Sequence, residues 1–125
     1  MSKFFAIAFG GALGALARYA VHSLVSHRLG NRFPYGTLVI NITACFLIGF
    51  VLTWFARRPD LNHFWRFLVP VGFIGAYSTF STFEWEVFVN LETGAFLPAS
   101  LYVLGSLGCG LLAVWLGVVL ARMTL

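Results

Sequence analysis

Short polar segments divide this chain into four long hydrophobic runs, at approximately residues 4–17, 33–55, 67–83 and 95–121. A helix needs about 20 residues to cross the hydrocarbon core of a bilayer. The second and fourth runs satisfy this length alone, and the others do so if Arg18, Glu84 and Glu86 lie near an interface or inside a bundle. The pattern predicts an all-α membrane protein of one domain, residues 1–125, with transmembrane helices at about 3–25, 33–56, 65–90 and 98–122.

Small residues form two stripes with a spacing of four residues. In the first predicted helix Ala6, Gly10 and Gly14 recur at this spacing, and Arg18 continues the stripe. Small side chains at this spacing let a second membrane helix approach closely. Arg18 either binds carbonyl or carboxylate partners inside the bundle or extends its guanidinium to the headgroups. The second stripe lies in the fourth predicted helix and predicts close packing, either within the subunit or across a dimer interface. It consists of Gly105, Cys109, Ala113, Gly117 and Ala121.

The second predicted helix has one polar or small face among Leu, Val, Ile and Phe residues. Asn41 lies more than one turn inside it, where an unsatisfied amide would cost several kcal/mol. Two interpretations are equally favoured: an interhelical hydrogen bond that joins helices, or a donor that faces a pore. The face consists of Thr37, Asn41, Cys45, Gly49 and Thr53.

Residues 72–83, GFIGAYSTFSTF, are poor material for a continuous helix, since these twelve positions hold two glycines and four Ser or Thr residues. Irregular backbone survives at membrane depth only where lipid does not reach it, so we expect a broken helix that lines a polar cavity. Beyond the break, Phe80 and Phe83 share one helix face, while Thr79, Thr82 and Glu86 follow another.

Composition and charge agree with a membrane protein. The chain is 60% hydrophobic and 10% charged, whereas soluble domains carry about 25% charged residues. The basic residues behind the net charge of +4 are scattered over the segment ends and form no cluster, which favours flanking charge on a membrane protein over a nucleic-acid-binding patch. The basic residues on the side of the termini would be Lys3, Arg57, Arg58, Arg66 and Arg122, against Arg28 and Arg32 opposite. This bias is modest and permits both orientations in the membrane.

The polar groups at membrane depth suit anion transport better than catalysis. No nucleophile has a suitably placed His, and no Gly-rich phosphate loop is present, so an enzyme is not expected. Amides, hydroxyls and the electropositive edges of Phe rings can replace water around a small anion without a fixed cation that traps it. Because four helices enclose little space, a pathway needs a second copy, and weak orientation bias allows an antiparallel pair whose freed carbonyls converge on a cation.

Three motifs in order resemble the Fluc family of fluoride channels. Residues 10–19, GGALGALARY, are similar to the family's GGxxGAxxRY; residues 36–41, GTLVIN, to GTLxxN; and residues 72–83 to GFxGxxTTFSTF. The resemblance covers essentially the whole chain. It implies a small bacterial four-span protein, with its third helix broken in mid-membrane, that forms an antiparallel, dual-topology homodimer with two fluoride pores.

Carried over by position, the resemblance implies that Asn41 contacts fluoride and that the ring edges of Phe80 and Phe83 meet the anion. Ser81 and Thr82 would belong to a hydroxyl track along the pore. The remaining pore side chains would be Thr37, Tyr102 and Ser106.

The resemblance also implies a structural sodium ion at the dimer centre, bound by the main-chain carbonyls of Gly75 and Ser78 from both subunits. Glu86 would lie in the vestibule near one pore mouth, and Arg18 would be structural. Residues 75–78 would then form the break and residues 79–83 the pore wall.

The expected function is passive export of fluoride across the bacterial inner membrane by a multi-pass protein, which confers fluoride resistance. Two alternatives stay open. A small four-helix multidrug exporter would need an acid within the first helix, which has none. A non-transporting membrane assembly subunit would explain the small-residue stripes but would not need the face of Thr37 and Asn41. In the motifs, Ser78, Ala44 and Glu84 depart from the family's commoner residues, and only Glu84 changes the vestibule charge.

Overall fold

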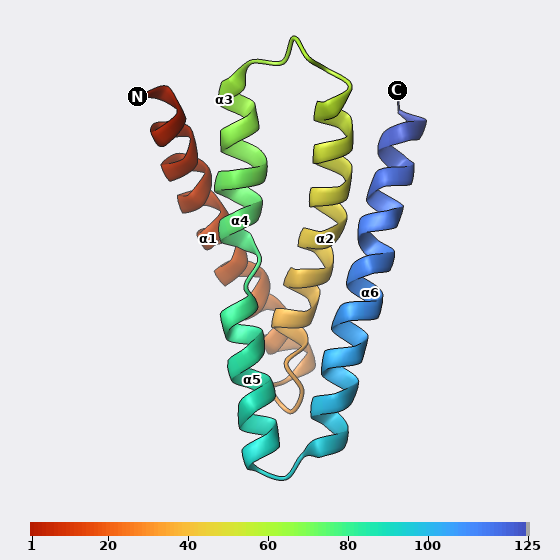
Figure 1. Ribbon diagram of the computed structural model, residues 1–125. Coiled ribbons are helices and arrows are strands. Elements are labelled where there is room, and N and C mark those ends of the chain that lie inside the picture. The colour runs from red at the N-terminus through yellow and green to blue at the C-terminus, as the bar shows by residue number, and fades with distance from the viewer. Residues whose placement is uncertain (125) are drawn as a thin grey trace.

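The computed structural model describes residues 1–124, and every regular element in that range is helical. Three helices are long and apolar enough to cross a membrane, which makes the chain a multi-pass membrane protein. The elements, of which all but η1 are labelled in Figure 1, are α1 (Ser2–Leu29), α2 (Tyr35–Ala56), α3 (His63–Arg66), the π-helix η1 (Phe67–Ile74), α4 (Gly75–Tyr77), α5 (Phe80–Glu92) and α6 (Phe96–Met123).

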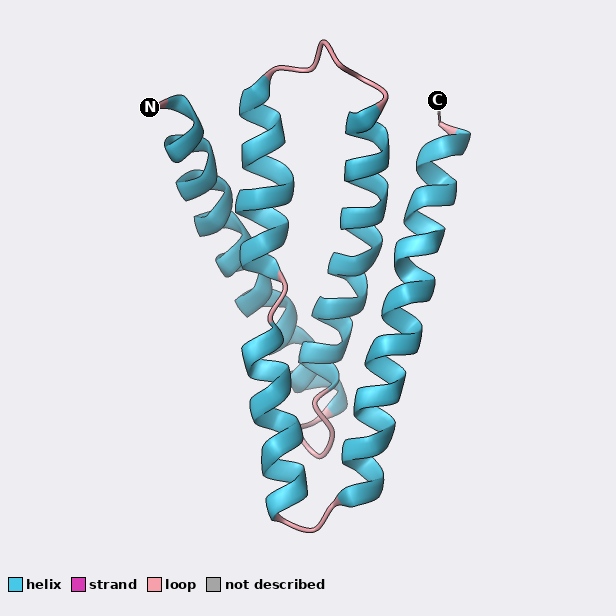
Figure 2. Ribbon diagram, in the orientation of Figure 1, coloured by secondary structure: helices cyan, strands magenta, loops and turns pink. Residues whose placement is uncertain are grey.

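The third expected span is a stack of shorter pieces, α3, η1, α4 and α5, and Figure 2 shows the interruption between α4 and α5 as a loop. The first helix is longer than expected, since it continues through residues 26–29 and ends where Gly30 takes a positive φ of 77°. Both termini and the α2–α3 loop lie at one end of the molecule, and the other two loops lie at the opposite end (Figure 1). The basic residues that the sequence places on the side of the termini therefore lie at one end of the molecule, and these are Lys3, Arg57, Arg58, Arg66 and Arg122.

Large apolar side chains cover the outside of the helices. On α6, Leu104 is 68% exposed, Leu111 73% and Trp115 59%. In water such a surface would be an aggregation site, whereas lipid tails solvate it. The small buried core lies between α2 and the η1–α4 segment and consists of Ile40, Ala44, Ile74 and Tyr77.

The glycine stripe of α1 packs directly on the backbone of η1. A Cβ atom on Gly10 would collide with the Leu68 carbonyl, and one on Gly14 would collide with the Phe73 carbonyl. From the other side, a Cβ on Gly72 would lie 2.8 Å from the Ile7 carbonyl oxygen. The prediction that this stripe lets another helix approach closely is confirmed, and the partner is η1.

The stripe of α6 divides into two halves. Its C-terminal half packs against α2, where a Cβ on Gly117 would collide with the Phe46 carbonyl and one on Gly49 with the Val114 carbonyl. In the N-terminal half, Gly105 has nothing within 4 Å of an added Cβ and Cys109 is exposed. Close packing within the subunit is therefore confirmed for the C-terminal half alone.

Replacing Gly14 by Ala should force α1 away from η1, because the added methyl meets backbone that has no rotamer to adopt. Overpacking of this kind costs about 1–3 kcal/mol. We expect the apparent melting temperature in detergent, followed by circular dichroism, to fall by several degrees. The matched control is Gly11→Ala, where the nearest atom, the Gly72 carbonyl oxygen, lies 4.0 Å away. Equal melting temperatures for the two variants would contradict the backbone contact.

Candidate functional site

The break in the third span lies at Ser78 and Thr79, which are both extended, with φ and ψ of −73° and 157° and of −149° and 113°. This position corrects the expectation that the break spans residues 75–78, since Gly75 belongs to the helical turn α4. The segment before α4 is the π-helix η1, which contains Pro70, and Pro70 has no N–H to donate to the hydrogen bonds of a regular α-helix. Thr79 ends the break as the N-cap of α5, where its hydroxyl accepts from the Thr82 N–H at 3.4 Å.

Asn41 of α2 pairs with the extended backbone of the break. Its Nδ2 donates to the Thr79 carbonyl at 2.9 Å, and the Thr79 N–H donates to its Oδ1 at 2.9 Å. The side-chain amide thus accepts the Thr79 N–H, which a continuous helix would have paired with the Gly75 carbonyl, and adds a donor to the Thr79 carbonyl at the start of α5. Of the two interpretations of Asn41, the interhelical one is realised, and the second hydrogen of Nδ2 is left for another acceptor.

A second contact from α2 holds the residue before the break. The Thr43 and Tyr77 hydroxyls lie 2.8 Å apart, and Tyr77 is buried. Sequence reasoning missed this pair, because a Thr and a Tyr that are 34 positions apart carry no shared pattern.

Beside the break lies a cavity of about 370 Å³, here called the break cavity, which is bounded by α2, η1, α5 and α6. Its polar or aromatic lining residues are Asn41, Ser78, Thr79, Phe80, Phe83 and Ser106. The structure therefore brings together four of the expected pore residues, Asn41, both phenylalanines and Ser106, with one of the expected sodium-binding residues at Ser78. Gly75 also lines it.

Ser106 is the unsatisfied member of this cavity. Among residues 1–124 its Oγ is the one buried side-chain polar atom for which the structure holds no hydrogen-bond partner. A buried hydroxyl without a partner costs free energy, so a position of this kind invites a bound acceptor or water.

The other expected pore residues meet at Glu86, and we call this group the Glu86 clasp. The Thr37 hydroxyl of α2 donates to Glu86 Oε1 at 2.7 Å, and the Tyr102 hydroxyl of α6 donates to Oε2 at 2.7 Å. Thr37 and Tyr102 are fully buried, whereas Glu86 is half-buried. Short bonds to a charged acceptor are the stronger kind, so the clasp fixes the carboxylate between three helices.

Aromatic rings connect the break cavity to the clasp. The Phe83 ring packs edge-on against Tyr102, with centroids 4.9 Å apart, and lies 6.0 Å from the Phe80 ring. Phe83 is buried, whereas Phe80 is 74% exposed. Ser81 and Thr82 are exposed on α5, and the Thr82 Oγ1 accepts from the Thr79 hydroxyl at 3.0 Å. The hydroxyl track is therefore split between the exposed face of α5 and the buried clasp.

On the far side of the clasp is a second, polar cavity of about 290 Å³, here called the mouth cavity. It opens between the α1–α2 loop and α5, with Glu86 in its wall, which agrees with the vestibule position expected for that residue. Its polar lining residues are His22, Ser26, Asn31, Arg32, Glu86 and Asn90. Arg32 and Asn90 were missed from the sequence, because the three segments that meet here are far apart along the chain.

Residues 5–118 match the sequence model of a family described as CrcB-like protein, Camphor Resistance (CrcB). The chain belongs to the CrcB family. Three relatives are named fluoride-specific ion channel FluC. That of Acidobacterium capsulatum is 54% identical over 96% of both chains. That of Solibacter usitatus is 44% identical over 96% of this chain and 98% of its own. That of Methylococcus capsulatus is 50% identical over 94% of this chain and 52% of its own.

In this CrcB-family chain the expected sodium ligands, the main-chain carbonyls of Gly75 and Ser78, lie at and just before the break. In a continuous helix the Thr79 N–H would bond the Gly75 carbonyl, but here it donates to Asn41. The carbonyls of Gly75 and Ser78 are thus candidates for a hard cation, as unwound backbone is in transporters. Carbonyl oxygens of unwound backbone are ligands that suit a sodium ion.

Arg18 of the CrcB chain is half-buried, one turn beyond Gly14 on α1. Its position agrees with either interpretation of the sequence, and its structural role stays a prediction.

Replacing Asn41 by Leu should release the break, because the Thr79 N–H would lose its acceptor and the Thr79 carbonyl would lose its second donor. Each buried backbone group left unsatisfied costs about 1–3 kcal/mol. We expect a lower melting temperature and faster hydrogen exchange at residues 78–80, measured by mass spectrometry. Asn31→Leu, in the exposed α1–α2 loop, makes the same side-chain change and should alter neither. Unchanged exchange in the Asn41 variant would show that the break does not depend on this amide.

Replacing Thr37 by Val keeps the side-chain shape and removes one donor from Glu86. Hydrogen bonds to charged groups are worth about 1.5–3 kcal/mol, so we expect a measurable loss of thermal stability in detergent. The matched control is Thr53→Val, the same change near the other end of α2. In a double-mutant cycle with Tyr102→Phe the two losses should not add, because both hydroxyls hold one carboxylate. Additive losses would refute the clasp as a unit.

Proposed function

We propose that this protein is a passive fluoride channel of the bacterial inner membrane that exports fluoride and confers resistance to it. Its CrcB-family membership and its relatives named fluoride-specific ion channel support this function. The observation that carries it in the structure is the unsatisfied Ser106 hydroxyl in the break cavity, beside the Asn41 amide and the rings of Phe80 and Phe83.

The pathway runs from the mouth cavity through the Glu86 clasp and past the Phe83 and Tyr102 rings into the break cavity. Every step offers a neutral donor or a ring edge, and none offers a fixed cation inside the membrane. Such a path replaces the hydration shell of a small anion without holding it too tightly to leave. At the clasp, fluoride and the Glu86 carboxylate compete for the same two hydroxyl donors, those of Thr37 and Tyr102.

The complete channel is an antiparallel homodimer with two pores in this proposal. Phe80 is 74% exposed beside the break, and Gly75 and Ser81 are also exposed there, so this face is available to a second copy. Two breaks that meet near the midplane would supply four carbonyls, from Gly75 and Ser78 of each subunit, to a sodium ion. That ion would be structural, holding the two broken helices together.

Passive export is physically sufficient for resistance. In an acidic medium fluoride enters a cell as the neutral weak acid HF, which ionises inside and is trapped as the anion. A channel for the anion then lets it leave down its own gradient without an energy source.

Purified protein in liposomes should release fluoride, read with a fluoride electrode, and Ser106→Ala should slow that release. Because the Ser106 hydroxyl has no partner in the protein, its removal should leave the melting temperature unchanged. Ser100→Ala, on the exposed part of α6, is the matched control and should release fluoride at the normal rate. Absence of release above empty liposomes, from correctly folded protein, would overturn the channel. Normal release by the Ser106 variant would remove this hydroxyl from the pathway.

A further inference from the structure

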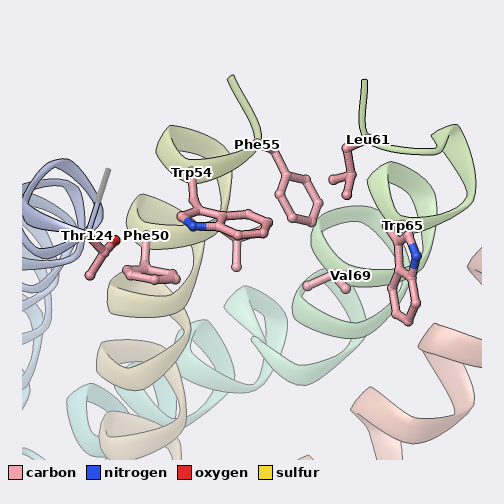
Figure 3. A pocket seen from close by; sticks show the side chains of 8 residues that line it. Phe50, Trp54, Phe55, Leu61, Trp65, Val69 and Thr124 are labelled. Atoms are coloured by element: carbon pink, nitrogen blue, oxygen red, sulfur yellow. The ribbon is translucent and has the colours of Figure 1, made fainter. Parts of the chain in front are cut away.

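An apolar cavity lies away from the pathway, at the end of the molecule where α1 begins and α6 ends. It has a volume of about 500 Å³, within the range of about 300–1,000 Å³ typical of small-molecule sites. Figure 3 shows Trp54 and Phe55 of α2 facing Leu61, Trp65 and Val69, with Phe50 and Thr124 on the side of α6. We call this cavity the rim groove, and its lining residues are Phe50, Val51, Trp54, Phe55, Leu61, Trp65, Val69 and Thr124.

The lining of the rim groove suits hydrocarbon. Apart from Thr124 its side chains are apolar or aromatic, so water inside it would find almost no hydrogen-bond partners. The groove lies immediately below the α2–α3 loop, and Trp54 and Trp65 are the residue type that gathers at the membrane–water interface. An acyl chain is the apolar molecule available at this depth.

Two guanidinium groups are fixed at the edge of the groove. The Arg66 Nη2 donates to the carbonyls of Phe55 at 3.1 Å and of Arg58 at 2.8 Å, which closes the C-terminal end of α2. The Arg58 guanidinium lies 4.2 Å from the centroid of the Trp54 ring. Both cations therefore stand directly beside apolar lining residues of the groove, with further N–H donors unused.

The charge of this end selects the headgroup. Lys3 in the first turn of α1, Arg57 directly after α2 and Arg122 in the last turn of α6 belong to the same end as Arg58 and Arg66. Among residues 1–124, Asp60 is the one acidic side chain at this end. A basic cluster next to an apolar cavity between membrane helices is complementary to an anionic phospholipid, as in known sites for acidic lipids.

We propose that the rim groove binds one anionic phospholipid, with an acyl chain between α2 and η1 and its phosphate on Arg58 and Arg66. The site is separate from the fluoride pathway, since no residue that lines the rim groove lines the break cavity or the mouth cavity. A bound acidic lipid would tie this end of each subunit to a leaflet that contains such lipids.

The test is native mass spectrometry of the full-length protein, released from micelles that contain equal amounts of phosphatidylglycerol and phosphatidylcholine. We expect preferential retention of phosphatidylglycerol. Arg58→Gln should weaken it about five-fold, the equivalent of about 1 kcal/mol for one basic residue near an anionic lipid. Arg28→Gln, at the opposite end of the molecule, removes the same charge and should leave retention unchanged.

A second variant tests the acyl chain without a change of charge. Val69→Trp should fill the groove and reduce phosphatidylglycerol retention while Arg58 and Arg66 remain. In a parallel measurement, lipids brominated on their acyl chains should quench Trp54 and Trp65 more strongly as phosphatidylglycerol than as phosphatidylcholine, and Trp54→Phe should reduce that difference.

Equal retention of the two lipids, or equal loss in the Arg58 and Arg28 variants, would reduce the bound lipid to ordinary annular lipid and overturn the site. Absence of quenching in a dimer that still releases fluoride would show that a second copy fills the groove instead. We expect the Arg58→Gln variant to release fluoride at the normal rate, because Arg58 lines neither the break cavity nor the mouth cavity. A failure of the lipid-site proposal would therefore not count against the proposed channel function.

Discussion

The pairing of the Asn41 amide with the backbone N–H and C=O of Thr79 is the contact on which the arrangement of the third span depends. A backbone N–H and C=O at membrane depth must be satisfied, and without a partner these groups would be drawn back into a continuous helix. Asn41 offers one acceptor and one donor in the geometry of a peptide, so the break costs little. The same contact frees the Gly75 carbonyl, sets the N-terminus of α5 and thereby aims Phe80 and Phe83.

The surrounding helices keep this contact in register. Glycines let α1 meet η1 and let α2 meet α6 at backbone distance, where no side chain can adjust to absorb a shift. Thr43 holds Tyr77 just before the break, and the Glu86 clasp ties α5 to α2 and α6 beyond it. The break is thus a fixed irregularity between two anchored helix ends. A site for a weakly bound anion needs this rigidity, because its selectivity depends on donors that do not follow the ion.

The break cavity and the Glu86 clasp differ in whether their buried hydroxyl groups are hydrogen-bonded within the protein. The clasp offers hydroxyls that a carboxylate occupies, whereas the break cavity offers a hydroxyl that nothing occupies. In the proposed pathway, donors that are hydrogen-bonded within the protein alternate with a free one, so an ion would move by exchange of partners. The proposed lipid site in the rim groove shares no lining residue with that pathway.

The sequence by itself determined an all-helical membrane protein, the common side of the termini, the interruption of the third segment and the close packing of the α1 stripe, because each follows from composition or spacing within one segment. It also named many of the polar residues that line the break cavity or form the Glu86 clasp, and their roles in a pore stay predictions. Only the tertiary structure decided which residues meet. Thr37, Asn41, Cys45 and Gly49 share one face of α2, yet the first two bond to α5 and the last packs on α6. It also placed the break at Ser78 and Thr79 instead of residues 75–78, because an amide from another helix accepts the Thr79 N–H. Helical periodicity describes neighbours on one helix and holds no information on which helix lies opposite.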